Sequence, residues 1–256
     1  MHSLKERIVL ITGASSGIGE SCARAFAAGG AKLVLAARRA GRIEELAGEL
    51  KAAHGAVSRL VALDVRDRRA VEAAVAALPE DWRAIDVLVN NAGLSRGLDK
   101  IHEGKIEDWE EMIDTNIKGL LYVSRAVLPG MVERGRGHVI NIGSIAGHEV
   151  YPMGNVYCAT KFAVDALTKG MRLDLNGTGI RVTGLDPGMV ETEFSRVRFH
   201  GDDARAAKVY AGASPLTPDD VADAAVWCAT RPPHVDVSDM IIMPTSQAST
   251  MLLHRK

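Results

Sequence analysis

The sequence predicts a single α/β domain that spans residues 1–256 and is built on a doubly wound parallel sheet. Short runs rich in Val, Ile and Leu alternate with alanine-rich stretches of helical periodicity, and parallel strands need such crossover helices. The strand-like runs are apolar throughout, which is typical of strands covered on both faces. A glycine-rich turn follows the first run, and no linker or low-complexity stretch divides the chain.

Each expected element has its own boundary signal. Strands are expected at 7–13, 32–38, 58–65, 85–93, 137–144, 180–188 and 239–244, where β-branched or leucine-rich runs occur. Helices are expected at 17–30, 42–55, 67–79, 105–135, 155–177 and 217–231. Glycines end the first two helices, while Thr217 and Pro218 suit the N-cap and first position of the last one. Seven strands with helices on both faces form a Rossmann-like sheet, and residues 194–216 are expected to form a substrate lid.

Composition narrows the class of protein. With 256 residues and 47% apolar side chains the chain can bury a full core, and its net charge of −1 predicts no nucleic-acid or membrane partner. The three cysteines (Cys22, Cys158 and Cys228) are far apart, and the histidines lack metal-ligand spacing, so reduced thiols and no metal are expected. No signal peptide or membrane-length apolar run is found, and a cytoplasmic location is expected.

The turn "TGASSGIG" places Gly13, Gly17 and Gly19 between the first strand and the first helix. Glycines there allow a tight turn and a close approach of the main chain to a pyrophosphate, and a helix N-terminus adds free N–H groups. We therefore expect this turn, with Ser15, Ser16 and Ile18, to bind a dinucleotide. Taken alone, the spacing also fits a glycine turn without a ligand.

Two arginines follow the second strand where an acidic residue would hold the adenosine ribose of NAD. No Asp or Glu occurs between Ser21 and Ile43, and Arg38 and Arg39 stand in that interval. A guanidinium can bind a phosphate through two hydrogen bonds and stack on adenine. The pattern predicts NADP, although Arg39 could instead be a solvated charge at a helix start.

The segment "YCATK" places Tyr157 and Lys161 one helical turn apart on one face. A nearby cation favours the phenolate and is expected to lower the tyrosine pKa, so that Tyr157 can exchange a proton with a substrate oxygen. Such a pair is common on helices, and its meaning depends on the other motifs.

Those motifs resemble the short-chain dehydrogenase/reductase family over essentially the whole chain. They are "TGASSGIG", "LDV" at 63–65, "NNAG" at 90–93, "TN" at 115–116, "NIGS", "YCATK" and "DPGMVET" at 186–192, in the order and spacing of the family.

The resemblance implies hydride transfer to or from a nicotinamide, coupled to proton transfer through Tyr157. Ser144 would polarise the reacting oxygen, Lys161 would hold the nicotinamide ribose and lower the tyrosine pKa, and Asn116 would anchor a proton-relaying water. Asp64 and Val65 would meet the adenine, and Asn91 the adjacent ribose. The residues that would flank the nicotinamide are Pro187, Gly188, Val190 and Thr192.

Within that family the sequence is most similar to the NADP-dependent 3-hydroxy acid dehydrogenases, including serine 3-dehydrogenases, through "MIDTNIKGL", "EFSRVRFHGDD" and "LTPDDVADAAVW". This implies oxidation of short 3-hydroxy acids, such as serine or 3-hydroxypropionate, to 3-oxo acids or semialdehydes, and the reverse reduction. The segment after Pro187–Gly188 is one residue shorter than in some members, which leaves its contacts open.

A carboxylate substrate needs a cation. Arg196 and Arg198 in the expected lid are the candidates, although both could be solvated charges. Glu149 could line the pocket and pair with a substrate amine. The resemblance also implies a homotetramer formed through the long helices.

Two alternatives remain. The protein could be another NADPH-dependent carbonyl reductase of the same family that acts on a different ketone or aldehyde. It could also be a non-catalytic NADP(H) sensor, a class expected to have lost Ser144, Tyr157 or Lys161, all of which are present.

Overall fold

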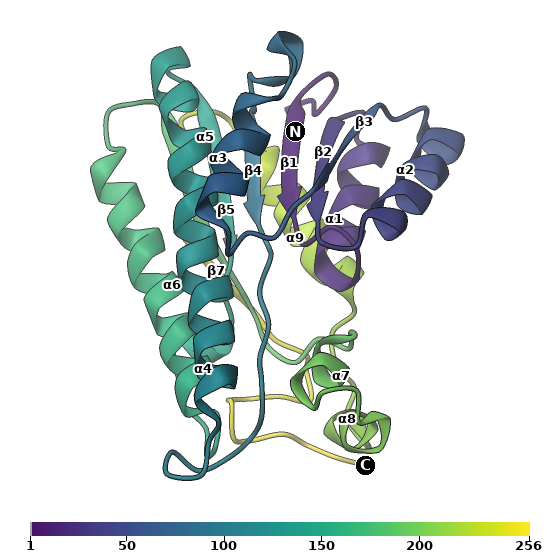
Figure 1. Cartoon of the computed structure of the whole chain (residues 1–256), viewed down its shortest axis with the longest axis vertical. Helices are drawn as coiled ribbons and strands as arrows, with labels where there is room; N and C mark the ends of the chain where they lie inside the picture. The colour runs from purple at the N-terminus through teal and green to yellow at the C-terminus, as the bar shows by residue number, and fades with distance from the viewer. Residues whose placement is uncertain (1) are drawn as a thin grey trace.

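The sheet of the computed structural model has the predicted seven strands, all parallel, in the order β3-β2-β1-β4-β5-β6-β7 (Figure 1). The structure describes residues 2–256. The strands are β1 (Ile8–Thr12), β2 (Lys32–Ala37), β3 (Ser58–Ala62), β4 (Val87–Asn90), β5 (Gly137–Ile142), β6 (Ile180–Pro187) and β7 (Asp239–Ile242). The chain winds outward from β1 to β3, returns to the middle at β4 and winds outward to β7. In such sheets ligands bind where this direction reverses, at the carboxyl ends of the strands.

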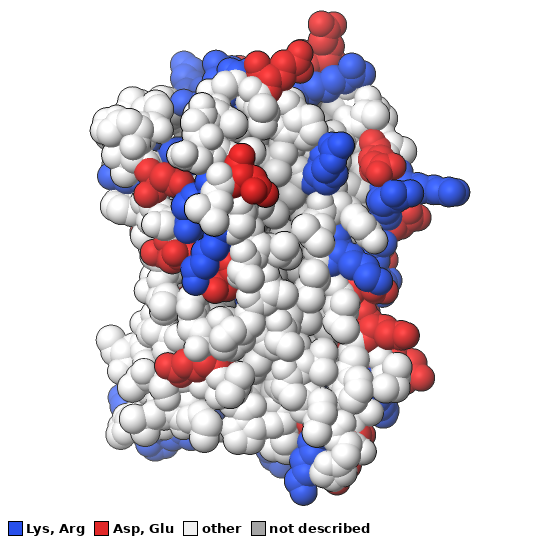
Figure 2. Space-filling model, turned by 90° about the vertical axis from the view of Figure 1, so that its left-hand side faces the viewer, with Lys and Arg blue, Asp and Glu red and all other residues white. Residues whose placement is uncertain are grey.

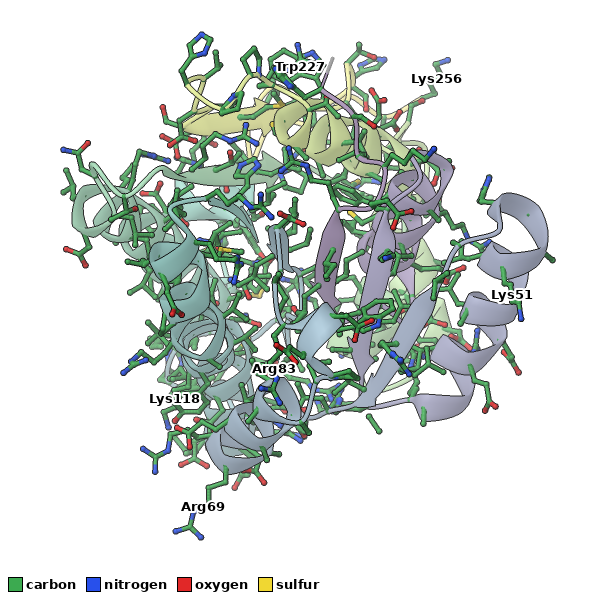
Figure 3. The ribbon with its side chains drawn as sticks, turned by 90° about the horizontal axis from the view of Figure 1, so that it is seen from above. Lys51, Arg69, Arg83, Lys118, Trp227 and Lys256 are labelled. Atoms are coloured by element: carbon green, nitrogen blue, oxygen red, sulfur yellow. The ribbon has the colours of Figure 1, made fainter. Side chains whose placement is uncertain are left out.

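Helices cover both faces of the sheet, as the alternating sequence predicts. One face is covered by α1 (Gly17–Ala28), α2 (Ala40–His54) and α9 (Pro218–Ala229). The other is covered by α3 (Arg68–Ala76), α5 (Leu120–Arg134) and α6 (Asn155–Asp174), while α4 (Ile106–Ile113) packs against α6 beyond the end of the sheet. Seen from above, the sheet separates Trp227 of α9 from Arg69 of α3 and from Lys118, which lies between α4 and α5 (Figure 3). Thr217 caps α9 as predicted, because its side chain accepts a hydrogen bond from the Asp220 N–H.

The core consists of two apolar layers, one on each face of the sheet. Ile11 of β1 packs in the layer that contains Phe26 of α1, while its neighbour Leu10 packs in the layer that contains Met131 of α5. Alternation along a strand sends successive side chains to opposite faces, and here both faces are apolar because both are covered.

The two edge strands differ from the prediction that every strand is covered on both faces. Leu60 of β3 is 43% exposed and Ile241 of β7 is 48% exposed. Each edge strand has one neighbouring strand, and the helices do not extend over its outer side. The apolar run alone does not distinguish an edge position from a central one.

The predicted helix at 105–135 consists of three consecutive segments. Between α4 and α5 lies η2 (Asp114–Gly119), a π-helical turn that contains Asn116. Two short 3₁₀ turns, η1 (Glu80–Trp82) and η3 (Ile145–Gly147), precede β4 and follow β5 respectively. In the part of the chain that the structure describes, no helix combines the length and apolar character needed to span a bilayer.

Residues 194–216 contain two short helices, α7 (Phe194–Arg198) and α8 (Asp203–Tyr210), beside the carboxyl ends of the strands (Figure 1). The C-terminal residues fold back over this region. The Lys256 N–H donates to the carbonyl of Gly212 at 2.9 Å, and the Thr250 N–H donates to Glu149 Oε2 at 2.9 Å. The tail thereby connects the end of α8 with the loop that precedes α6.

Candidate active site

A cleft of about 600 Å³ lies at the carboxyl end of the sheet, within the size range of small-molecule sites. Its walls are formed by residues that follow β1 to β6, by α7 and by the end of α8. Gln247 and Thr250 of the C-terminal tail complete the wall. The motifs that the sequence places at the ends of separate strands therefore meet in one cavity.

The glycine turn forms one end of the cleft. Gly13 has a φ of +66°, and a Cβ at Gly19 would lie 2.4 Å from the Gly13 carbonyl oxygen and 2.4 Å from Asn91 Nδ2. Asn91 Nδ2 donates to the Thr12 carbonyl at 2.9 Å and so fixes the turn from β4. The Ser16 side chain does not cap α1, which leaves the first N–H groups of the helix able to bind an anion.

The two arginines after β2 lie beside this turn. Arg39 donates to Ser16 Oγ at 2.6 Å and forms an ion pair of 2.9 Å with Glu193. Arg38 is 3.9 Å from a Glu111 carboxylate oxygen, and its side chain is 53% exposed. Both arginines line the cleft. A turn that only glycines can form, an uncapped helix start and two guanidinium groups together fit a dinucleotide that carries an additional phosphate.

Most of the predicted cofactor residues line the cleft. Asp64 does so with both carboxylate oxygens bonded to Arg66, and these hydrogen bonds lower the pKa of Asp64. The other members of the predicted set that line it are Gly13, Ser15, Ser16, Gly17, Ile18, Val65, Asn91, Pro187, Gly188, Val190 and Thr192. Gly19 lies behind the turn, where its lack of a side chain lets Gly13 and Asn91 approach.

Tyr157 and Lys161 lie on the buried face of α6, one turn apart as predicted. Tyr157 is 9% exposed and Lys161 is 8% exposed, and both line the cleft. Lys161 Nζ donates to the carbonyl of Ile142, the last residue of β5, at 2.9 Å. Burial lowers the pKa of Lys161 to about 8, while the negative charge of Asp186 acts in the opposite direction.

The pKa of Tyr157 differs from the lowered value that the sequence predicts. Burial, reinforced by the adjacent Tyr151, raises the pKa of Tyr157 well above its usual range, whereas Arg198 and a hydrogen bond with Ser144 act to lower it. Desolvation of the phenolate outweighs the nearby positive charge, because the phenol lies in an apolar wall. Tyr157 is therefore held as a protonated phenol.

Ser144 lies at the end of β5, where it begins the turn η3. Its Oγ accepts a hydrogen bond from the Ala146 N–H at 3.1 Å, and its own N–H donates to Asp186 Oδ1 at 3.1 Å. These two contacts fix the side chain and the main chain of Ser144. Its hydroxyl is thereby held beside Tyr157 in the wall of the cleft.

Asn116 is buried in the π-helical turn behind the cleft. Its Oδ1 accepts from the Leu94 N–H at 2.8 Å, and its Nδ2 donates to the Leu94 carbonyl at 2.8 Å and to Thr160 Oγ1 at 3.0 Å. The Asn116 amide thereby connects the loop that follows β4 with α6. With both amide hydrogens used in this way, a water bound here would depend largely on main-chain groups of the turn.

Arg198 extends from α7 into the part of the cleft that contains Tyr157. Its guanidinium carbon lies 5.1 Å from the ring centre of Tyr157, 5.7 Å from that of Tyr151 and 5.3 Å from that of Phe194. Nε donates to Ser95 Oγ at 2.8 Å, and Nη2 donates to the Tyr151 hydroxyl. Nη1 donates no hydrogen bond to the described part of the chain and is free to bind a ligand.

The two other predicted substrate residues lie elsewhere. The Arg196 side chain is 61% exposed and pairs with Asp203 at 2.9 Å, outside the cleft. Glu149 is not among the residues that line the cleft, because its carboxylate accepts hydrogen bonds from the Thr250 N–H and hydroxyl. The hydrogen-bonding partner of the Glu149 carboxylate is therefore the C-terminal tail.

Three residues in or beside the cleft are not identified by sequence reasoning. Gln247, whose Oε1 accepts from the Met189 N–H at 2.7 Å, lines the cleft, whereas Ser95, which holds Arg198, lies outside the lining. His148, which contacts Asp186, is likewise not marked by any spacing pattern. Only the proximity of Ser95 to "NNAG" and of His148 to "NIGS" could have drawn attention to them.

A buried phenol, a fixed hydroxyl and a buried lysine face a cleft whose far end suits a dinucleotide. This arrangement is that of a nicotinamide-dependent oxidoreductase site.

Comparison with known proteins agrees with this class. The family model for short chain dehydrogenase matches residues 7–203. The chain belongs to the short-chain dehydrogenase family.

Particular relatives are similar over almost their whole length. The chain is 52% identical over 250 residues to the NADP-dependent 3-hydroxy acid dehydrogenase YdfG of Salmonella typhi, covering 97% of this chain and 99% of that protein. It is 43% identical over 257 residues to the NADP-dependent 3-hydroxy acid dehydrogenase of Schizosaccharomyces pombe, covering 100% and 99%. A solved structure described as the closed form of serine dehydrogenase complexed with NADP+ superposes with a TM-score of 0.91 at 49% identity, covering 97% of this chain and 100% of that one.

Proposed function

We propose that the protein interconverts a short 3-hydroxy acid and the corresponding 3-oxo acid or semialdehyde by hydride transfer, with NADP as cofactor. The observation that favours an acidic substrate is the position of Arg198. Its guanidinium lies beside the ring of Tyr157, and its Nη1 is free. A substrate carboxylate bound to Nη1 would therefore bring the hydroxyl-bearing carbon of the same substrate close to the Tyr157 hydroxyl. A relative named for 3-hydroxy acids matches 97% of this chain and 99% of its own length, and the serine dehydrogenase structure shares the fold.

NADP is the cofactor that suits the adenosine end of the cleft. Arg38 and Arg39 offer two guanidinium groups there, and Arg39 already bonds the glycine turn through Ser16. A 2′-phosphate would be attracted to both groups and would replace the Glu193 carboxylate as the partner of Arg39. Relatives at 43–52% identity are NADP-dependent by name.

The chain supplies the proton and the orientation. Hydride exchange is the chemistry that NADP provides when it is bound. In the reducing direction the protonated Tyr157 hydroxyl donates its hydrogen to the substrate oxygen, and Ser144 Oγ donates a hydrogen bond to the same oxygen. In the oxidising direction Tyr157 takes the hydroxyl proton, and positive charge from Lys161 and Arg198 stabilises the negative charge that develops.

The charges around the substrate favour a 3-hydroxy acid without an ammonium group. The carboxylates that line the cleft are those of Asp64 and Glu193, and both are paired with arginines at the adenosine end. Glu149 is bonded to Thr250. An ammonium group, as in serine, would therefore lie near Arg198 without a carboxylate partner. We expect a higher kcat/KM for 3-hydroxypropionate than for L-serine.

The roles of α7–α8 as a lid and of the homotetramer are part of the same proposal. Arg96 donates to the Val197 carbonyl, and Ser95 accepts from Arg198, so α7 rests on the loop after β4.

On the face formed by α5 and α6, charged side chains are sparse, and exposed apolar residues include Leu121, Phe162 and Leu173 (Figure 2). Burial of that face in a cytoplasmic tetramer would remove this surface from water. Light scattering after size exclusion would give the mass that tests it.

The test is the initial rate of NADPH formation with 3-hydroxypropionate and NADP+. The same assay with L-serine, with a neutral secondary alcohol and with NAD+ provides the comparison. We expect turnover of the 3-hydroxy acid with NADP+ at a kcat/KM at least about tenfold above that with NAD+, since a charge-assisted contact contributes about 1.5–3 kcal/mol. Activity on the neutral alcohol alone would contradict the carboxylate proposal, and a preference for NAD+ would contradict the assignment of the arginines.

A further inference from the structure

Behind Ser144, on the side away from the cleft, lies a buried carboxylate. Asp186 is the penultimate residue of β6 and is 3% exposed. Its Oδ1 accepts a hydrogen bond from the Ser144 N–H at 3.1 Å. A Cβ at Gly143 would lie 1.7 Å from the same oxygen, so the main chain of Gly143–Ser144 passes directly over the carboxylate. Asp186 thus fixes the segment that presents the Ser144 hydroxyl.

The second oxygen of Asp186 is bonded to a histidine. His148, at the end of η3, has its Nε2 at 3.0 Å from Asp186 Oδ2, and its side chain is 23% exposed. An ionised carboxylate can only accept, so Nε2 carries the hydrogen. The carboxylate is shielded from solvent, whereas the imidazole lies between it and the surface.

The charge of Asp186 acts on the catalytic lysine. Burial raises the pKa of Asp186, and the hydrogen bond from His148, with the positive charge of Lys161, opposes that rise. In return the carboxylate opposes the lowering of the Lys161 pKa by burial. The other charged groups near this carboxylate are Lys169 of α6 and Asp239 of β7.

We propose that His148 and Asp186 are a pair of positioning residues, in which His148 holds Asp186 as a carboxylate, and that carboxylate fixes the Ser144 main chain and keeps Lys161 cationic. The proposal rests on the proposed function, because it assigns catalytic consequence to Ser144 and Lys161. Without the donor at His148, burial would raise the pKa of Asp186 further and favour its protonated form. Its bond to the Ser144 N–H would weaken, and Lys161 would lose its negative neighbour.

The proposal predicts a pH-dependent effect that a purely structural role would not produce. In His148→Ala, kcat for oxidation of 3-hydroxypropionate should be closest to the parent value at the alkaline end of the pH profile and fall at least about tenfold below it toward the acidic end. In Asp186→Asn, kcat should be low throughout this range, because the charge is absent at every pH. His148→Gln restores a neutral N–H donor near the position of Nε2 and should recover most of the activity lost at low pH.

A double-mutant cycle tests whether His148 acts through Asp186. Adding His148→Ala to Asp186→Asn should change kcat by less than about twofold at any pH. The matched control is His102→Ala, because the His102 side chain is 70% exposed and lies outside the cleft. The dissociation constant for NADPH, measured by fluorescence, should remain within about threefold of the parent in all variants.

Two results would overturn the proposal: a loss in His148→Ala that is the same at all pH values, or a further loss when it is added to Asp186→Asn. A measurement independent of turnover is the free energy of unfolding against pH. Because an elevated carboxyl pKa in the folded state costs stability as pH rises, the destabilisation by His148→Ala should grow with rising pH and vanish in the Asp186→Asn background. If the parent does not oxidise 3-hydroxypropionate, the proposed function fails, while this stability cycle still tests the pair.

Discussion

Burial and hydrogen bonding act in opposite directions on Tyr157. The apolar wall raises the pKa of the phenol, while Ser144 and Arg198 favour the phenolate. In the proposed mechanism the tyrosine is therefore a protonated donor that requires positive charge nearby before it can act as a base. Lys161 and Arg198 are the cations that line this part of the described cleft.

Replacement of Tyr157 by Phe removes the exchangeable proton and leaves the ring that Arg198 and Phe194 contact. We expect kcat to fall by about 10²–10⁴-fold, the usual contribution of general acid–base catalysis. NADPH binding, followed by fluorescence, should change little. Tyr122→Phe is the matched control, since Tyr122 lies on α5 and outside the cleft. A Tyr157→Phe protein with parental kcat would contradict the mechanism.

Sequence reasoning at the residue scale succeeded where a motif defined the position. The glycine turn, Ser144, Tyr157 and Lys161 all line the cleft. The sequence does not indicate which of Arg196 and Arg198 faces the cleft. Side chains two positions apart in a helix point about 200° apart, and the sequence does not give the orientation of α7. The sequence predicts a substrate contact for Glu149, whereas its carboxylate accepts from Thr250. The sequence does not reveal this partner because it lies 101 residues away in the tail.

At the scale of elements, the alternation of apolar runs and helical stretches was sufficient to predict all seven strands. Each central strand is flanked by helices on both faces, so most of its residues are apolar and buried. The exposure of β3 and β7 was not predictable, because edge position depends on the strand order. The π-helical turn was missed because its residues keep the helical pattern of α4 and α5.

A buried histidine in strand β5 makes the stability of the fold depend on pH. His138 of β5 is 1% exposed and bonds Thr183 Oγ1 of β6 at 2.8 Å through Nε2, and burial lowers its pKa well below the usual value. Unfolded chains protonate histidine near about pH 6.5, whereas the folded protein does not. The stabilising contribution of neutral His138 is therefore complete above that pH and is lost as pH falls below it.

His138→Gln should remove this dependence, because glutamine can retain a hydrogen bond and does not titrate. We expect the parent to lose up to about 1.4 kcal/mol more unfolding free energy per pH unit than the variant between about pH 6 and about pH 5. Urea unfolding at each pH measures it, with His102→Gln as the exposed control. Parallel curves for the parent and His138→Gln would show that His138 is protonated in the folded state.

At the scale of the whole molecule, the cleft is assembled from segments distant in sequence. Residues that follow β1 to β6 form the proposed cofactor end and the wall that contains Ser144, Tyr157 and Lys161, α7 contributes Arg198, and the C-terminal tail closes the remaining side. The family resemblance predicts the first two groups because they contain motifs. The tail contributes the side chains of Gln247 and Thr250 and is held by main-chain contacts such as that between Lys256 and Gly212, which the sequence does not indicate.

The central claim is that Arg198 binds the carboxylate of a 3-hydroxy acid beside Tyr157. The most direct measurement is the ratio of kcat/KM for 3-hydroxypropionate to kcat/KM for a neutral secondary alcohol, compared between Arg198→Met and the parent. We expect this ratio to fall by about 10–100-fold in Arg198→Met, as the loss of a charge-assisted hydrogen bond predicts. It should stay at the parental value in Arg196→Met, whose side chain pairs with Asp203 outside the cleft. An unchanged ratio in Arg198→Met, or an equal fall in both variants, would contradict the claim.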